Sequence, residues 1–217
     1  MPAAEIDEAM EQASRALYET RYFEAARLAR GALDAALAEQ DWDRVARICL
    51  PLQEARRQIR QLAVDAGHAG AVRVLRDPAD PAGEGLALCM PELPEHEAVA
   101  IRDRLDREGR PAFLLRVAEI QPEGWVLSGI PDRGPHKLAA PPEDWAEGAL
   151  PSVEWFEAAA EAIGDAAIKG AKGLPPADRV RRLLGWLDTL PEHEKLHQRL
   201  AEAAREAAAE ASGPAPA

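Results

Sequence analysis

Cysteine is scarce in this sequence. The chain has two cysteines in 217 residues, Cys49 and Cys89, and each stands among apolar neighbours. Two cysteines in such surroundings exclude a disulfide framework and are typical of small buried thiols in a reducing compartment. We therefore expect a cytoplasmic protein stabilised by a packed core, which its 47% hydrophobic content can supply.

Long apolar runs are also missing. No stretch approaches the roughly 18 apolar residues that cross a bilayer. The N-terminal sequence MPAAEIDEAMEQ has neither the basic segment nor the apolar segment of a secretory leader. We expect no membrane-spanning segment, no secretion and no membrane partner.

Positive charge is in deficit. The chain has 26 Lys and Arg residues against 38 Asp and Glu residues, which gives a formal net charge of -12. A surface of this sign repels phosphate backbones and anionic lipid headgroups. Nucleic acid is therefore not an expected partner.

Helical periodicity is abundant at both ends of the chain. Apolar residues recur at helical spacing from about Glu5 to Ala66 and again from Ser152 to Ala211, whereas residues 68–150 hold short β-forming runs between Pro and Gly. The predicted fold class is α+β, predominantly helical. Its predicted regions are an N-terminal helical hairpin region (1–67), a small β-α-β-β element (68–150), a C-terminal three-helix region (151–212) and a disordered tail (213–217).

A small-residue pattern marks the predicted second helix. Tyr22 is followed by Ala25, Ala29 and Ala32-Leu33, and Trp42, Val45, Cys49 and Leu52 echo this spacing 20 residues later. The pattern resembles the second helix of a tetratricopeptide repeat, in which small residues let two antiparallel helices cross closely; repeats of that family recur every 34 residues. The resemblance implies an architecture, a tetratricopeptide-like helical hairpin.

The central region predicts four strands and one helix. The strands are expected at 71–75, 86–90, 112–120 and 125–130, and the helix at 95–108. A QPEG sequence between the last two strands is typical of a hairpin turn. The segment from Asp132 to Pro151 is expected to be irregular, and Pro51 is expected to kink or split the third helix.

One motif suggests metal chemistry. His193-Glu194-Lys195-Leu196-His197 matches the H-E-x-x-H pattern, in which two histidines one helical turn apart bind zinc and the glutamate acts as general base.

The surroundings of this motif oppose a zinc site. The only later acids, Glu202, Glu206 and Glu210, would face away on the same helix, at about 180°, 220° and 260° from His193. His96 and His136 are the remaining candidates for an outside ligand. We predict that His193 and His197 share one face of a helix that starts near Pro191, pack against neighbours and bind no catalytic zinc.

No residue is therefore assigned a catalytic, cofactor-binding or metal-binding role, and no cofactor is expected. The leading interpretation is a protein-interaction or scaffold module with a protein partner. One alternative is a zinc-dependent hydrolase that uses His193, Glu194 and His197. A further alternative is small-molecule binding by the central region, at the carboxyl ends of its strands.

Overall fold

The computed structural model describes residues 2–68 and 72–212. The start of the first predicted strand at Ala71 and the predicted tail at 213–217 lie outside the described residues. In the described part the chain is predominantly helical and holds one five-stranded sheet, so the predicted α+β class is confirmed. Within residues 2–68 and 72–212, no helix is both long and apolar enough to cross a bilayer.

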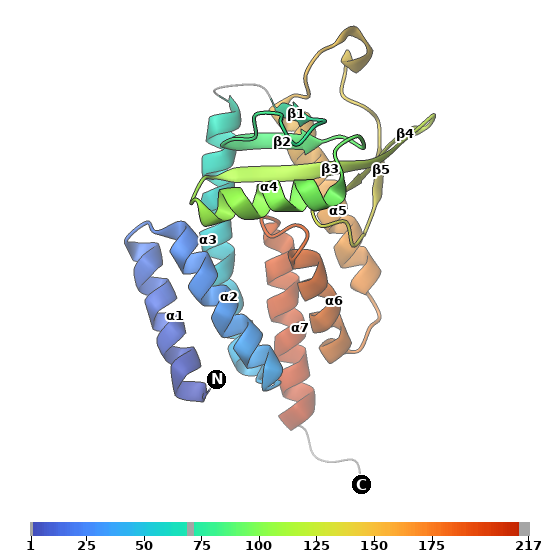
Figure 1. Cartoon of the computed structure of the whole chain (residues 1–217). Coiled ribbons are helices and arrows are strands. Elements are labelled where there is room, and N and C mark those ends of the chain that lie inside the picture. The colour runs from blue at the N-terminus through green and yellow to red at the C-terminus, as the bar shows by residue number, and fades with distance from the viewer. Residues whose placement is uncertain (1, 69–71, 213–217) are drawn as a thin grey trace. The chain divides into compact units, whose positions relative to one another are not determined.

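Seven α-helices and one short 3-10 helix are present in the described ranges (Figure 1). The helices are α1 (Ala3–Tyr18), α2 (Tyr22–Ala38), α3 (Trp42–His68), α4 (Glu95–Arg107), α5 (Val153–Ala171), α6 (Pro176–Leu187), α7 (Glu194–Ser212) and the 3-10 helix η1 (Trp145–Glu147). The strands are β1 (Arg73–Leu75), β2 (Gly85–Cys89), β3 (Ala112–Gln121), β4 (Gly124–Ser128) and β5 (Lys137–Ala139).

The chain divides into two compact units, and each draws on distant parts of the sequence. Unit 1 comprises residues 1–58, 171–184 and 194–217, and unit 2 comprises residues 59–170 and 185–193. Unit 1 is helical, and α1 and α2 form an antiparallel hairpin in it (Figure 1). Small buried residues line this hairpin, as their spacing predicts, including Ala13, Ala25 and Ala29.

Unit 2 contains the sheet, in the order β1-β2-β3-β4-β5. The first three strands are parallel, and β4 and β5 are antiparallel to their neighbours. The two-residue connection between Gln121 and Gly124 forms the predicted hairpin. Gly124 has a φ of 148°, and a Cβ there would lie 2.5 Å from the Ala139 carbonyl oxygen, so β5 can approach β4 only at a glycine.

Helices cover both faces of this sheet. On one face α4 packs through Ala98, Ile101 and Leu105 against strand residues that include Leu114. On the other face, Phe113 meets Phe156 of α5 edge to face with ring centroids 5.2 Å apart. The parallel strands are thus buried on both sides, which explains the continuous burial of β2.

One sequence-based expectation about local structure differs from the fold, and a second is narrowed by it. The sequence predicts an irregular segment from Asp132 to Pro151, but this segment contains β5 and η1. These elements have three residues each, and β5 is largely exposed, so neither has a periodic apolar pattern to reveal it. Of the two outcomes expected at Pro51, a kink or a split, the structure excludes the split, because α3 continues through the proline with Ile48, Leu52 and Ala55 buried around it.

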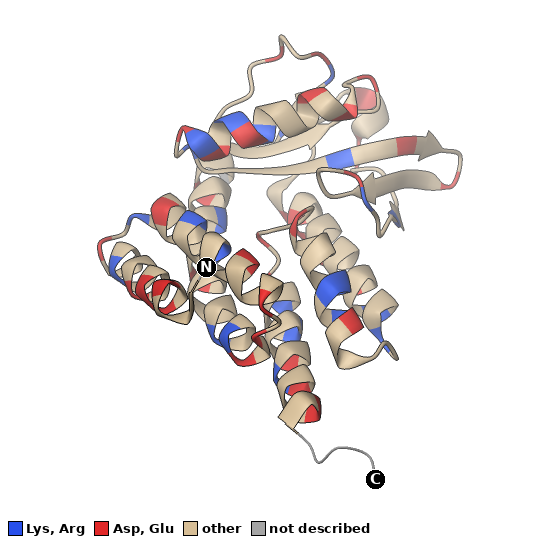
Figure 2. Ribbon diagram, turned by 60° about the horizontal axis from the view of Figure 1, so that its bottom comes forward, with Lys and Arg blue, Asp and Glu red and all other residues tan. Residues whose placement is uncertain are grey.

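The net negative charge is concentrated in unit 2. Unit 2 has 22 acidic residues against 11 Lys and Arg, whereas unit 1 has 16 against 15. Figure 2 shows both signs interspersed along the helices. The long-range field of unit 2 therefore favours cations and disfavours anions.

Candidate functional site

A cavity of about 300 Å³ opens where β1 ends in unit 2. It is lined by Val74, Arg76, Trp145, Gly148, Ala149 and Leu150. Val74 and Arg76 are two residues apart along an extended segment, so their side chains project to the same side. The cavity lies at the carboxyl end of a parallel strand, which is where ligands commonly bind in sheets of this kind.

Trp145 is the aromatic residue that lines this cavity, and it belongs to a cluster of three tryptophans. Trp145 on η1 meets Trp125 of β4 edge to face, with centroids 4.8 Å apart, and Trp125 also meets Trp155 of α5 at 5.9 Å. Asp144 and Gly148, on either side of η1, have φ values of 56° and 89° and turn the chain tightly there. The indole of Trp145 is thereby held in a fixed position at the cavity.

The charged group of the cavity is Arg76. Its guanidinium lies over the Trp145 ring, 5.7 Å from the centroid, and its Nη1 is 2.7 Å from Oε1 of Glu92. The backbone N–H groups of Arg76 and Asp77 donate to Oδ2 of Asp80 at 2.6 and 2.9 Å, and these hydrogen bonds lower the pKa of Asp80. Hydrogen bonds to Asp80 therefore fix the backbone at Arg76, and the Arg76 guanidinium lies beside the apolar wall of the cavity.

The H-E-x-x-H residues do not share one helix. α7 begins at Glu194, and His193 precedes it in a turn in which the His193 N–H donates to the Leu190 carbonyl at 3.2 Å. The expected start near Pro191 is therefore wrong for His193, because Pro191 and Glu192 form this turn instead. His193 and His197 are both buried, at 1% and 2% exposure.

His193 faces α5. Its Nε2 lies 3.3 Å from Oε2 of Glu161, and these two residues and Asp165 each offer a ligand atom within 4.8 Å of the other two. This is the one group of three or more potential metal ligands in residues 2–68 and 72–212, and it contains neither Glu194 nor His197.

The other two candidate histidines lie elsewhere in unit 2. His96 on α4 has a side chain that is 80% exposed and lies 3.6 Å from Glu97. The Nε2 of His136 lies 2.8 Å from Oδ1 of Asp132. Neither belongs to the group around His193.

Sequence reasoning missed Glu161, Asp165 and the glycine between them, Gly164. The two acids are one helical turn apart on α5, a spacing that places them on one face. Because the histidine comes from a distant segment, no local motif connects the three residues.

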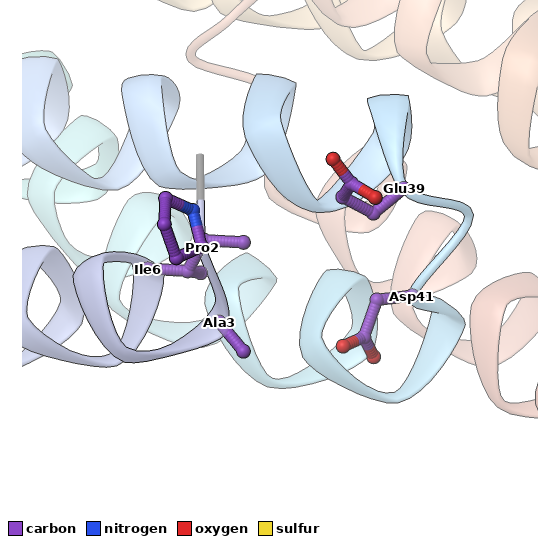
Figure 3. A pocket seen from close by; sticks show the side chains of 5 residues that line it. All are labelled: Pro2, Ala3, Ile6, Glu39 and Asp41. Carbon is purple, nitrogen blue, oxygen red and sulfur yellow. The ribbon is translucent and has the colours of Figure 1, made fainter.

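Unit 1 has a wider cavity of about 550 Å³, lined by Pro2, Ala3, Ile6, Glu39 and Asp41 (Figure 3). Asp41 is engaged in capping α3, where its Oδ1 accepts the Arg44 N–H at 3.1 Å. Arg44 also donates to Asp7 at 2.8 and 3.0 Å, and this hydrogen bonding lowers the pKa of Asp7. These carboxylates fix the start of α3 relative to α1, so this cavity is a weaker candidate for a ligand site.

Comparisons with known proteins give no relative. No family model matches the chain, and neither a curated protein nor a solved structure resembles it significantly. The case for any function therefore depends on the chain's own residues.

Proposed function

We propose that unit 2 is a binding domain for a small organic carboxylate, held in the cavity beside Trp145. The single observation that carries the proposal is this cavity, in which the Arg76 cation adjoins an apolar and aromatic wall. Arg76 recognises the carboxylate, since guanidinium and carboxylate match in charge and geometry. Trp145, Val74 and Leu150 contact the apolar part of the ligand.

The size of the cavity restricts the ligand. A volume of about 300 Å³ lies at the lower limit for small-molecule sites, so the ligand is a compact molecule of the size of phenylacetate. The acidic surroundings do not prevent this binding, because charges in solvent are largely screened beyond about 8 Å at physiological ionic strength. The local contact with Arg76 therefore outweighs the distant acids.

Titration calorimetry with phenylacetate and its neutral analogue phenylacetamide tests the proposal. We expect the acid to bind at least about tenfold more tightly, because hydrogen bonds to a charged group contribute about 1.5–3 kcal/mol. Arg76→Gln should abolish this preference. Glu92→Gln should strengthen binding of the acid, since Arg76 then loses the carboxylate that competes for it.

Arg110→Gln is the matched control. Arg110 is a partly exposed arginine of the same unit, which lies 3.7 and 3.6 Å from Glu84 and Glu108 and does not line the cavity. This variant should bind like the wild type. Equal affinity for the acid and the amide, or an acid preference that survives Arg76→Gln, would refute the proposal.

The protein-interaction role expected for the helical region stays a prediction. Its support is the hairpin of α1 and α2, together with the exposure of two large apolar side chains in unit 1, Tyr18 at 90% and Leu50 at 71%. The cavity in unit 2 provides the more specific chemistry, and we rank ligand binding first for that reason.

A further inference from the structure

A second site in unit 2 lies apart from the cavity residues, where α5 meets the segment before α7. Glu161 and Asp165 project from α5, and His193 reaches them from residues 185–193. The three side chains offer one imidazole nitrogen and two carboxylate oxygens that lie within 4.8 Å of one another. We infer that Glu161, Asp165 and His193 bind one divalent transition-metal ion, with Zn²⁺ as the preferred ion.

The position of the imidazole depends on Gly164. A Cβ at Gly164 would lie 2.2 Å from both Cδ2 and Nε2 of His193, so the ring occupies the place of the absent side chain. Glycine inside a helix is unfavourable by about 1 kcal/mol relative to alanine. Its presence between Glu161 and Asp165 lets the ring edge approach both acids.

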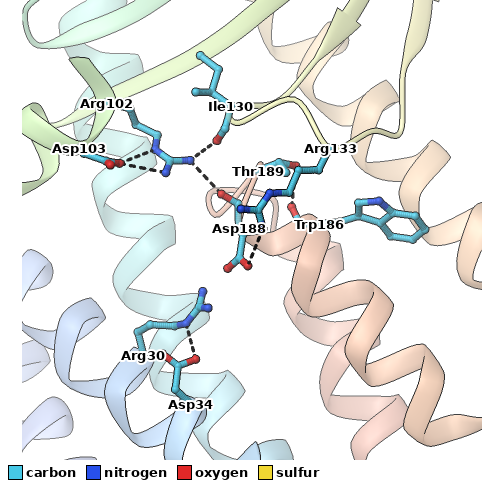
Figure 4. Close-up of polar contacts among 9 residues, drawn as sticks. All are labelled: Arg30, Asp34, Arg102, Asp103, Ile130, Arg133, Trp186, Asp188 and Thr189. Carbon is cyan, nitrogen blue, oxygen red and sulfur yellow. Dashed lines mark hydrogen bonds and ion pairs between the residues drawn. The ribbon is translucent and has the colours of Figure 1, made fainter. Parts of the chain in front are cut away.

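The segment that carries His193 accepts hydrogen bonds from the residues that follow β4 and from α4 (Figure 4). The Ile130 N–H donates to the Thr189 carbonyl at 2.9 Å. Arg102 donates through one nitrogen to the carbonyls of Ile130 and Asp188, the latter at 2.9 Å. Figure 4 also shows Arg133 close to the Asp188 carboxylate, 3.9 Å away. The buried imidazole is therefore supported by a rigid backbone.

The donor distances suit a metal after a small adjustment. Zinc binds histidine nitrogen and carboxylate oxygen at about 2.0–2.2 Å, so two donors on one ion lie at most about 4.4 Å apart. The three donors already lie within 4.8 Å of one another. Asp165 is exposed and Glu161 is half-buried, so side-chain rotation of these residues can complete the site.

Arg60 orients Glu161 without occupying the oxygen that faces the histidine. It lies 3.1 Å from Oε1 of Glu161 and 3.1 Å from Oε1 of Glu157, whereas His193 approaches Oε2 of Glu161. Hydrogen-bonded carboxylates of this kind are typical of metal sites, where a neighbouring group fixes the ligand.

The donor set selects the type of ion. Imidazole suits zinc and other transition metals, whereas Mg²⁺ and Ca²⁺ take oxygen ligands. Two carboxylates neutralise the charge of a divalent ion. Three protein ligands also leave room for water on the ion, because zinc is usually four-coordinate.

Calorimetric titration of the full-length, tag-free chain with ZnCl₂, after chelator treatment and dialysis, tests the inference. We expect one Zn²⁺ per chain and at least about tenfold weaker binding of Mg²⁺. Asp165→Asn removes an exposed ligand and should weaken Zn²⁺ binding at least about tenfold while leaving the circular dichroism spectrum unchanged. His193→Gln should have the same effect on binding.

His136→Ala is the matched control, because His136 and Asp132 form a partly exposed histidine–carboxylate pair in the same unit. This variant should bind Zn²⁺ like the wild type. The inference is overturned if the wild type takes up no stoichiometric Zn²⁺, if Asp165→Asn and His193→Gln both bind normally, or if His136→Ala abolishes binding. If His193→Gln fails to fold, the test depends on Asp165→Asn alone. Weakened Zn²⁺ binding by that variant supports the site, and unchanged binding overturns it.

Discussion

Two non-glycine residues that follow helices adopt the left-handed backbone conformation, which favours glycine. Thr20 and Gln40 have φ values of 58° and 54° after α1 and α2. The turns close alike, since the Arg21 N–H donates to the Ala16 carbonyl at 2.8 Å and the Asp41 N–H donates to the Ala36 carbonyl at 2.9 Å. A left-handed conformation costs a non-glycine residue about 1–2 kcal/mol.

Thr20→Gly should therefore raise the free energy of unfolding. We expect a gain of about 0.5–1 kcal/mol, because relief of the left-handed strain exceeds the entropy that glycine adds to the unfolded chain. Gln40→Gly should give a smaller gain, since glutamine lacks the branched Cβ that makes threonine unfavourable here. Urea denaturation measures both effects, and a loss of stability in Thr20→Gly would show that the threonine side chain contributes more than its backbone costs.

The two cysteines should be unreactive in the folded protein. Burial raises the pKa of Cys49 to about 12 and that of Cys89 to about 12. At pH 8 the thiolate fraction is then roughly a thousandfold lower than for an ordinary thiol of pKa about 8.5. An absorbance assay with a disulfide reagent should detect almost no thiol in the native chain and two after denaturation; rapid reaction of the native chain would contradict the burial of both groups.

At the scale of elements, two helical glycines can be compared, Gly31 and Gly164. Substitution by alanine raises helix propensity at both positions, but an added Cβ fits sterically only at Gly31. In Gly164→Ala the new methyl group would overlap the His193 ring, whereas at Gly31 in α2 an added Cβ would meet no atom within 4 Å. We expect Gly31→Ala to stabilise the protein by about 0.4–1 kcal/mol and Gly164→Ala to destabilise it by about 1–3 kcal/mol. Chemical denaturation measures both, and stabilisation by Gly164→Ala would show that the ring moves away freely.

Elements with strong periodicity could be predicted from the sequence. The helix expected at 95–108 is α4, Glu95–Arg107, because its apolar residues form one stripe and acids occupy its first turn. Three of the predicted strands coincide with β2, β3 and β4 to within about two residues. The short β5 could not be predicted, because its three residues depend on pairing with β4 and not on a pattern of their own.

The sites were less predictable than the elements. The motif identified His193 as a residue of interest, but its partners on α5 are supplied by tertiary packing. The cavity beside Trp145 could be predicted only as a location at the carboxyl ends of the strands. The edge-to-face cluster of Trp125, Trp145 and Trp155 joins a strand, a 3-10 helix and an α-helix, and no spacing in the sequence connects the three residues.

At the scale of the whole molecule, each unit is assembled from segments far apart in the chain. Unit 1 combines α1 and α2 with α7, and within it Arg179 of α6 lies 2.9 Å from Glu206 of α7. Unit 2 draws in residues 185–193, which carry His193. The metal site proposed for unit 2 therefore depends on His193, which follows Glu161 by 32 residues and Asp165 by 28.

The uneven distribution of charge gives a prediction about nucleic acid. Unit 2 has 22 acids against 11 bases, and the near balance in unit 1, 16 against 15, provides no surplus of cations to neutralise phosphates. Binding to duplex DNA draws most of its non-specific free energy from such neutralisation, with the release of condensed counterions. We therefore expect that the full chain does not retard duplex DNA in a gel-shift experiment at physiological salt. We expect the same result at about 50 mM salt, where electrostatic binding to DNA is orders of magnitude stronger. Stoichiometric retardation that weakens steeply with added salt would mean that Lys and Arg residues converge on one face despite their interspersion with acids along the helices (Figure 2).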